Sequence, residues 1–232
     1  MLSKPELAVR TGAWIALAGF ILSAPIAFPI VMLIAPQPEW VSVEIFKANY
    51  HHIQELPYYL GFILISGMVV LVYSHKPENY AGHPTIQSEL GISRVLITIF
   101  ATLVIFNYIC QTTLIPHLVK DPSTMNDSMI AAFTMSNPDS LSWAIEMWGY
   151  LIMAKALWLL RGCYRNQITS LPLLFVVNLI MSIISVVWTI IDPYWVGTTL
   201  GLVLYFAWNV LMIMILVFII RISKRNSHLY AS

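Results

Sequence analysis

Six long apolar segments, each able to cross a bilayer as a helix, constrain this chain more than any other feature. They lie near residues 12–34, 57–73, 95–116, 141–160, 171–191 and 197–220. A helix rises 1.5 Å per residue, so about 20 apolar residues cross about 30 Å of hydrocarbon. The second segment is the shortest, but residues before Pro57 can extend its helix because proline suits a first turn. We therefore predict one all-α integral-membrane domain, residues 1–232, built as a bundle of six transmembrane helices.

The composition agrees with this class. Hydrophobic residues make up 59% of the chain and charged residues only 10%, whereas soluble domains carry about 25% charged residues. The net charge of +1 provides no basic excess for a phosphate backbone, so a nucleic-acid partner is not expected. The first apolar stretch, at about 22 residues, is longer than the h-region of a cleaved signal peptide. It is therefore predicted to be a retained first helix.

The basic residues predict the orientation of the bundle. Of the 12 Lys and Arg, only Lys47 and Lys120 fall on one side, and Lys155 lies within a span. Cytoplasmic loops carry an excess of Lys and Arg, so both termini are predicted to be cytoplasmic in a multi-pass protein of the inner (plasma) membrane. The remaining basic residues, all on the predicted cytoplasmic side, are Lys4, Arg10, Lys76, Arg94, Arg161, Arg165, Arg221, Lys224 and Arg225.

Two short segments outside the spans have helical patterns. Residues 39–56 are predicted to form an amphipathic helix on the outer surface before the second span. One face of this helix carries Trp40, Val43, Phe46, Tyr50 and Ile53. The connection between the third and fourth spans contains Met125, Met129 and Phe133 at helical spacing, between turn signals. It too is predicted to be a short surface helix.

A polar stripe runs along the fifth apolar segment. Its members recur at intervals of four and three residues, which places them on one helical face: Asn178, Ser182, Ser185, Thr189 and Asp192. Such a face is not expected to meet lipid, so it should face the inside of the bundle. Polar stripes between membrane helices can also serve only as interhelical hydrogen bonds, and that alternative stays open.

Glu146 is the acidic residue set deepest in an apolar segment, roughly 8 Å below the outer boundary of the fourth span. An unpaired carboxylate facing lipid costs at least about 2.5 kcal/mol, so Glu146 should face the interior. Pro25 and Pro29 are expected to bend the first helix beside it. We predict an outward-facing pocket centred on Glu146, whose other ligand-binding residues are Asn107, Gln111, Tyr205, Asn209 and the stripe Asn178, Ser182, Ser185, Thr189 and Asp192.

No metal or cofactor is predicted. His51 and Glu55 lie four residues apart, but zinc needs three or four ligands and nothing in the sequence brings His117 to that pair. The chain lacks the zinc-protease, nucleophile-elbow, phosphate-loop and Cys-x-x-Cys signatures. An enzyme is therefore the less favoured interpretation.

Three places in the chain carry a resemblance. The second span opens with Tyr58-Tyr59-Leu60-Gly61-Phe62, the fourth contains Glu146-Met-Trp-Gly-Tyr-Leu-Ile-Met-Ala, and a basic loop, Arg161 to Arg165, leads through Leu171-Pro172 into the fifth. In these places the chain resembles a group of uncharacterised bacterial inner-membrane proteins with six spans and a domain of unknown function. The resemblance implies the six-span fold, and it implies no particular activity because none is established for the group.

Three functions follow from these predictions. The first is binding or transport of a small molecule or cation through the outward-facing polar pocket. The alternative is an accessory or scaffold subunit of a larger membrane complex, with a membrane partner or a second copy of the chain. The third is a membrane enzyme that acts on a lipid or apolar substrate, with Glu146 or Asp192 as acid or base.

Overall fold

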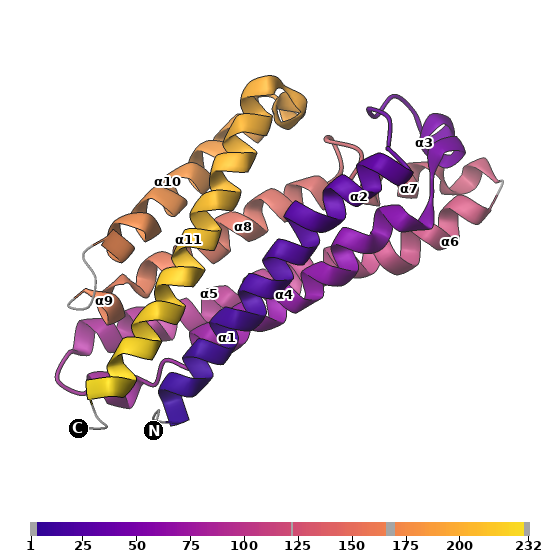
Figure 1. The fold of residues 1–232 in the computed structure, drawn as a ribbon. Helices are drawn as coiled ribbons and strands as arrows, with labels where there is room; N and C mark the ends of the chain where they lie inside the picture. The colour runs from indigo at the N-terminus through magenta and orange to yellow at the C-terminus, as the bar shows by residue number, and fades with distance from the viewer. Residues whose placement is uncertain (1–3, 122, 166–169, 230–232) are drawn as a thin grey trace.

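The computed structural model describes residues 4–121, 123–165 and 170–229, and within these ranges it is helical with no strand (Figure 1). Five helical stretches are long and apolar enough to cross a membrane. They correspond to five of the six predicted segments and run Glu6–Ile34, His52–Tyr73, Pro84–Lys120, Ser170–Ile191 and Thr199–Ser223. The all-α membrane class predicted from the sequence is confirmed to this extent.

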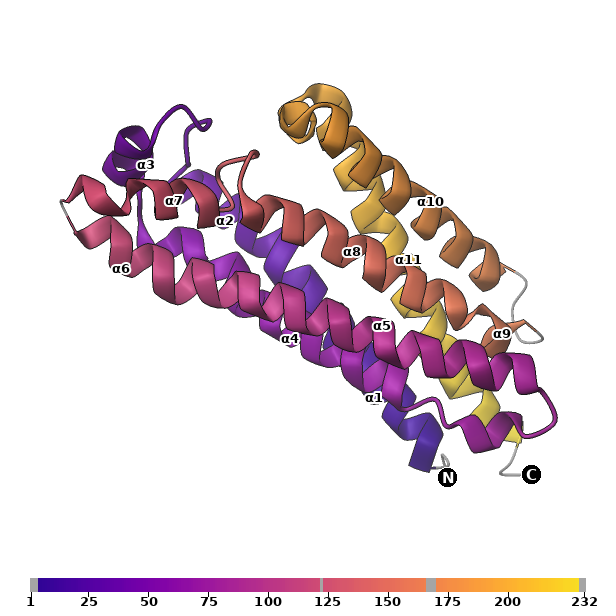
Figure 2. The same cartoon turned by 180° about the vertical axis from the view of Figure 1, so that it is seen from behind.

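The fourth predicted span is the helix α8, Leu141–Leu159, with 19 residues. It is not among the five because Glu146, Lys155 and several aromatic residues lower its hydropathy. Its length is about 28 Å at 1.5 Å per residue. Figures 1 and 2 show that α8 runs alongside the long helices, between α5 and α10.

The six long helices pack in a closed order. The helix α1 (Lys4–Ile21) contacts α4 (Leu56–Tyr73), which contacts α5 (Pro84–Ile109), and α5 contacts α8. The order continues through α10 (Ser170–Ile191) to α11 (Thr199–Leu229), which returns to α1. Both ends of the described chain lie at the same end of the bundle (Figures 1 and 2). The hydrophobic core lies between these helices.

Glycines set the closest helix pair, α1 and α4. A Cβ atom added to Gly19 would collide with the backbone of Leu64, and one added to Gly67 with the backbone of Ala16. Gly12 likewise faces the backbone of Leu71. Small residues allow membrane helices to approach until their backbones touch, which explains why α1 and α4 share the most extensive contact in the bundle.

Two π-helical turns interrupt the long helices. The first, Leu22–Ile26, contains Pro25 and leads into α2 (Ala27–Ile34). It lies where the sequence predicted a bend, because proline has no N–H to donate to the preceding turn. The second, Cys110–Leu114, joins α5 to α6 (Ile115–Lys120), whose second residue is Pro116. This second turn was not predicted from the sequence.

The predicted outer-surface helix over 39–56 is wrong in extent. The structure has a seven-residue helix, α3 (Val43–Asn49), then extended backbone at Tyr50 and His51, and then a 3₁₀ turn, His52–Glu55. The Gln54 side chain explains the break, because it binds the Asn49 carbonyl and the backbone N–H of His51. These contacts cap a new turn at His51 rather than continue the helix.

The second short helix forms as α7 (Asp127–Phe133), after a 3₁₀ turn at Thr124–Asn126. Its buried side is centred on Ile130 rather than on the methionines of the helical pattern. Ile130 is fully buried, whereas Met125 is 87% exposed and Met129 is also exposed. Ile130 packs with residues of α3 and α6 in a small outer cluster: Phe46, Ile115 and Leu118.

Several helix bounds also differ from the predictions. The helix α5 begins at Pro84, whereas the predicted span begins near residue 95. The first three turns of α5 are largely polar, so they were not part of the apolar pattern that predicted the span. The helix α11 continues to Leu229 rather than 220. The remaining short helices are α9 (Arg161–Tyr164) and the 3₁₀ turns Pro77–Tyr80 and Pro193–Gly197. The side chains of Lys4, Lys224 and Arg225, used in the orientation argument, lie outside the part that the structure describes.

Candidate functional site

The interface between α5 and α8 contains the candidate site. Ser140 caps the first turn of α8 by accepting a hydrogen bond from the Trp143 N–H. The helix then directs Ser142, Glu146 and Gly149 toward α5, and all three are buried. A Cβ on Gly149 would lie 2.7 Å from a Val104 methyl carbon, so the absence of a side chain there lets α5 approach Glu146 closely.

The Glu146 side chain is 6% exposed, and both of its carboxylate oxygens accept hydrogen bonds from α5. Asn107 Nδ2 donates to Oε2 at 2.9 Å, and the Tyr108 hydroxyl donates to Oε1 at 2.9 Å. The Tyr108 hydroxyl also lies 3.2 Å from the Tyr150 hydroxyl. None of the ion pairs found among the described residues includes Glu146.

Gln111 extends this network toward the end of α7. The π-helical turn that holds it directs its amide group at the segment following α7. Its Nε2 donates to the Phe133 carbonyl at 2.7 Å and lies 3.3 Å from both Asn107 Oδ1 and Ser142 Oγ. Its Oε1 accepts the backbone N–H of Met135 at 3.0 Å. We refer to Asn107, Tyr108, Gln111, Ser142, Glu146 and Tyr150 as the Glu146 network.

The chemistry of the Glu146 network follows from its donors, which are all neutral. They orient the carboxylate but do not cancel its charge. A buried charge without a counter-ion is costly even when it is hydrogen-bonded. The arrangement is therefore suited to a carboxylate that takes up a proton or binds a small cation.

The inner part of the polar stripe lies close to this network. Asn178 is fully buried, and its Oδ1 accepts a hydrogen bond from Trp208 Nε1 at 3.0 Å. The Trp208 ring packs edge-on against Tyr150, with 5.2 Å between ring centroids. Ser182 is also buried and donates to the Asn178 carbonyl. Asn178 Nδ2 is buried without a hydrogen-bond partner among the described residues.

The outer part of the stripe has a different role. Ser185 Oγ lies 3.7 Å from Met147 Sδ on α8. Thr189 Oγ1 accepts a hydrogen bond from Trp195 Nε1 at 2.8 Å, and Asp192 caps the 3₁₀ turn by accepting the Tyr194 N–H at 3.0 Å. Thr189 and Asp192 thus order the connection between α10 and α11 rather than join the Glu146 network.

The two site residues predicted from the sixth span, Asn209 and Tyr205, differ in burial. Asn209 is buried, donates to the Tyr205 carbonyl at 2.7 Å, and keeps an Oδ1 for which the described residues offer no partner. Tyr205 is 40% exposed. The Tyr205 side chain nevertheless interacts with the Asn209 side chain and, electrostatically, with Glu146.

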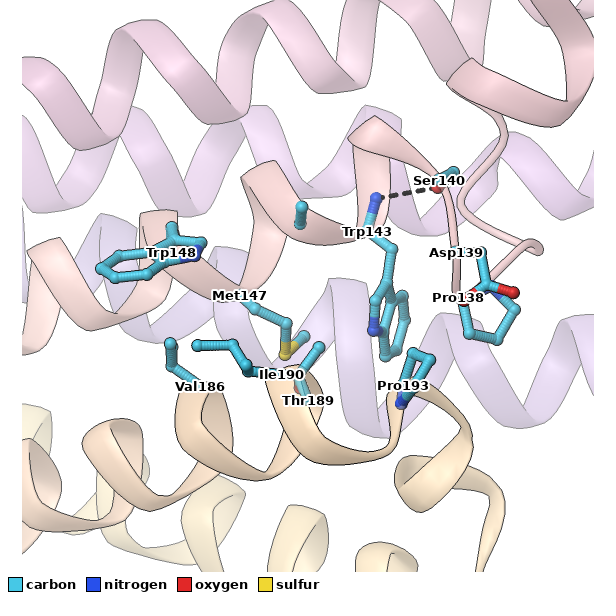
Figure 3. A pocket seen from close by; sticks show the side chains of 11 residues that line it. Pro138, Asp139, Ser140, Trp143, Met147, Trp148, Val186, Thr189, Ile190 and Pro193 are labelled. Atoms are coloured by element: carbon cyan, nitrogen blue, oxygen red, sulfur yellow. Dashed lines mark hydrogen bonds between the residues drawn. The ribbon is translucent and has the colours of Figure 1, made fainter. Parts of the chain in front are cut away.

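A cavity opens between the first turns of α8 and the last turns of α10 (Figure 3). Its volume is about 370 Å³, and Met147 from α8 lies across it from Thr189 and Ile190 of α10. Trp143 and Trp148 give it an aromatic wall, while Asp139 adds a carboxylate. Glu146 is not among the lining residues, because its side chain points toward α5 rather than toward α10. The network and the cavity are thus neighbours on two sides of one helix.

Sequence reasoning missed Tyr108, Tyr150 and Trp208 as members of the site. The spacing contained a signal for Tyr150, which follows Glu146 by four residues and therefore shares its face. Tyr108 directly follows Asn107, and a neighbouring residue points about 100° away on a regular helix. Only the packing of α5 on α8 shows that both side chains reach the same carboxylate.

Of the residues considered for a metal site, Glu55 lies in a cluster apart from the Glu146 network. His52 Nδ1 lies 2.7 Å from Glu55 Oε1, and the hydroxyls of Tyr50 and Tyr59 also donate to Glu55. Burial and the neighbouring Glu55 carboxylate raise the pKa of Tyr50. Within the described ranges, no three His, Cys, Asp or Glu side chains gather closely enough to hold a metal ion.

Comparisons with known protein families, with curated proteins and with solved structures find no match for this chain. The resemblance to bacterial six-span proteins stays a prediction. The site must be interpreted from its own geometry.

Proposed function

We propose that this chain is an inner-membrane protein that binds or transports a small molecule or cation, with Glu146 as the titratable centre of the site. One observation carries the proposal: the buried Glu146 carboxylate of α8 is held by neutral donors from α5, with no ion pair to it among the described residues. Ionisable groups inside membrane bundles mark ion or substrate paths more often than structural contacts, because burying them is costly.

The proposal includes α8 as a sixth span. Its neighbours α5 and α10 are both candidate spans, and its length suits the hydrocarbon thickness. Six spans place both termini on one side of the membrane, which the basic residues favour as the cytoplasm. The cavity between α8 and α10 then opens on the outer side. It reaches Met147, the sequence neighbour of Glu146 on another face of α8, so access to the carboxylate needs a rearrangement of α8.

The test uses Glu146→Gln, which keeps the size of the side chain and one acceptor oxygen but removes the charge. Native mass spectra of the gently solubilised protein should show a retained molecule in the wild type and not in the variant. In proteoliposomes containing a pH-sensitive dye, an imposed Na⁺ or K⁺ gradient should drive a pH change that the variant loses. Unchanged spectra together with unchanged fluxes would contradict the proposal.

Glu55→Gln is the matched control. Glu55 is another buried carboxylate, 5% exposed, but it binds Tyr50, His52 and Tyr59 outside the Glu146 network. This variant should retain the bound molecule and the flux. Loss of both in the two variants alike would mean that any buried acid supports the fold, and would count against a specific role for Glu146.

A second candidate function, a subunit of a larger membrane complex, is favoured by another observation. Gln111 and Glu146 have all their polar side-chain atoms engaged within the chain, as expected for hydrogen bonds that only hold helices together. In this case Glu146→Ala would lower the melting temperature without changing any flux. A second polypeptide would then appear at fixed stoichiometry in the native mass spectra.

A further inference from the structure

A second and larger cavity lies at the opposite end of the bundle from Figure 3. Its volume is about 560 Å³, and it is lined by residues from the start of α5 and by residues of α9 and just after it. Figures 1 and 2 show α9 and the start of α5 at the end of the bundle where both termini lie. None of its lining residues belongs to the Glu146 network.

The charged side chains around this cavity are mostly basic. Arg161 and Arg165 line it together with His83, against one carboxylate, Glu89. Arg165 is exposed, so its charge is available at the opening. The cavity therefore has a positive balance at the end of the bundle where most of the basic residues occur.

Arg161 is held in place before any ligand arrives. Its guanidinium lies 3.6 Å over the Trp158 ring, Nη2 donates to Glu89 Oε1 at 2.9 Å, and Nη1 donates to the Trp158 carbonyl at 3.3 Å. A guanidinium has five N–H donors, so others are left for a further acceptor. Arginine forks match the oxygens of phosphate groups particularly well.

The level of the cavity relative to the bilayer indicates the source of the phosphate. The Lys155 side chain also packs on Trp158, with Nζ 4.2 Å from the centroid of the Trp158 ring. Tryptophan and lysine side chains of this kind mark the interface between hydrocarbon and headgroups. Ile86 and Pro172 add apolar surface to the wall. Basic pockets between helices on the cytoplasmic side are suited to lipid headgroups.

We propose that this cavity binds the phosphate headgroup of an anionic phospholipid of the cytoplasmic leaflet, through Arg161 and Arg165. A free phosphate compound has the same chemistry, but it would not use the apolar wall or the interfacial level. The leaflet rests on the orientation proposed above, but the binding itself does not depend on the function proposed for Glu146, because the two sites share no residue.

The experiment titrates the detergent-solubilised protein with phosphatidylglycerol and, separately, with phosphatidylcholine of identical acyl chains, and counts bound lipids by native mass spectrometry. The wild type should prefer phosphatidylglycerol. Arg165→Gln should weaken that binding about fivefold, since a basic residue near a lipid surface contributes about 1 kcal/mol. Because Arg161 also pairs with Glu89, Arg161→Gln is a secondary variant and its melting temperature is recorded alongside.

Arg221→Gln is the matched control, since Arg221 is an exposed arginine on α11 that does not line the cavity. It should leave phosphatidylglycerol binding unchanged. Equal losses in Arg165→Gln and Arg221→Gln would overturn the proposal in favour of a diffuse basic surface. Equal affinity for the two lipids would also overturn it. Stabilisation by inorganic phosphate alone, with no further effect of lipid, would assign the cavity to a soluble phosphate compound instead.

Discussion

At the residue scale, His75 shows how burial changes the chemistry of a polar side chain. It follows the last turn of α4 and is 6% exposed. Its Nδ1 lies 2.9 Å from the Leu71 carbonyl, and its Nε2 lies 2.7 Å from the Tyr164 hydroxyl. The first contact requires a donor and the second suits an acceptor, so the neutral ring satisfies both. Burial therefore lowers the pKa of His75 from 6.5 to about 4, assisted by the nearby Arg94 charge.

This pKa predicts a pH dependence of stability. The unfolded chain takes up a proton on His75 below its ordinary pKa of about 6.5, whereas the folded chain resists it until about pH 4. The neutral His75 ring contributes about 3 kcal/mol to the free energy of unfolding above pH 6.5. This contribution is lost as the pH falls from 6.5 toward 4. Melting temperatures of the wild type should fall over this range more steeply than those of His75→Gln. Parallel curves would show that His75 does not titrate in this way.

At the scale of elements, the pair α1 and α4 depends on the lack of side chains at three glycines. Gly67→Val would drive two methyl groups into the backbone of Ala16 and separate the helices. Overpacking of this kind costs about 3 kcal/mol, or roughly 10 °C in melting temperature for a chain of this size. The control is Gly82→Ala, where an added Cβ meets nothing within 4 Å. A variant at Gly67 as stable as this control would show that the two helices do not pack as closely as described.

At the scale of the whole molecule, the number of spans decides which loops share a side. If α8 crosses the membrane, the segment before it and the connection between α10 and α11 lie on the same side. Single cysteines introduced as Ser128→Cys and Gly197→Cys, both at exposed positions, test this after Cys110 and Cys163 are replaced by alanine. A membrane-impermeant maleimide added to whole cells should label both and should not label Gly82→Cys. Labelling of only one of the first two would mean that α8 does not cross.

The sequence by itself determined the elements of the fold. Apolar length predicted the long helices. Spacing predicted that Asn178 and Ser182 turn inward, and the cost of a carboxylate in lipid predicted the same for Glu146; the structure buries all three. These properties are local, since helix formation and burial in a membrane depend on residues within a few turns. The outer-surface helix over 39–56 was predicted wrongly for the same reason. Its pattern was helical, but the contacts of the Gln54 side chain end α3 at Asn49.

Only the tertiary structure decided which polar faces meet. The order of helices around the bundle depends on contacts between residues far apart in the chain, such as Gly67 with Ala16 and Glu146 with Asn107. Ten residues predicted to share one pocket are thereby divided. Gln111 and Asn107 join Glu146, while Thr189 lines a separate cavity and Tyr205 is 40% exposed. Periodicity predicts the direction in which each side chain leaves its own helix. Only the packing of the helices determines which side chains of a neighbouring helix it contacts.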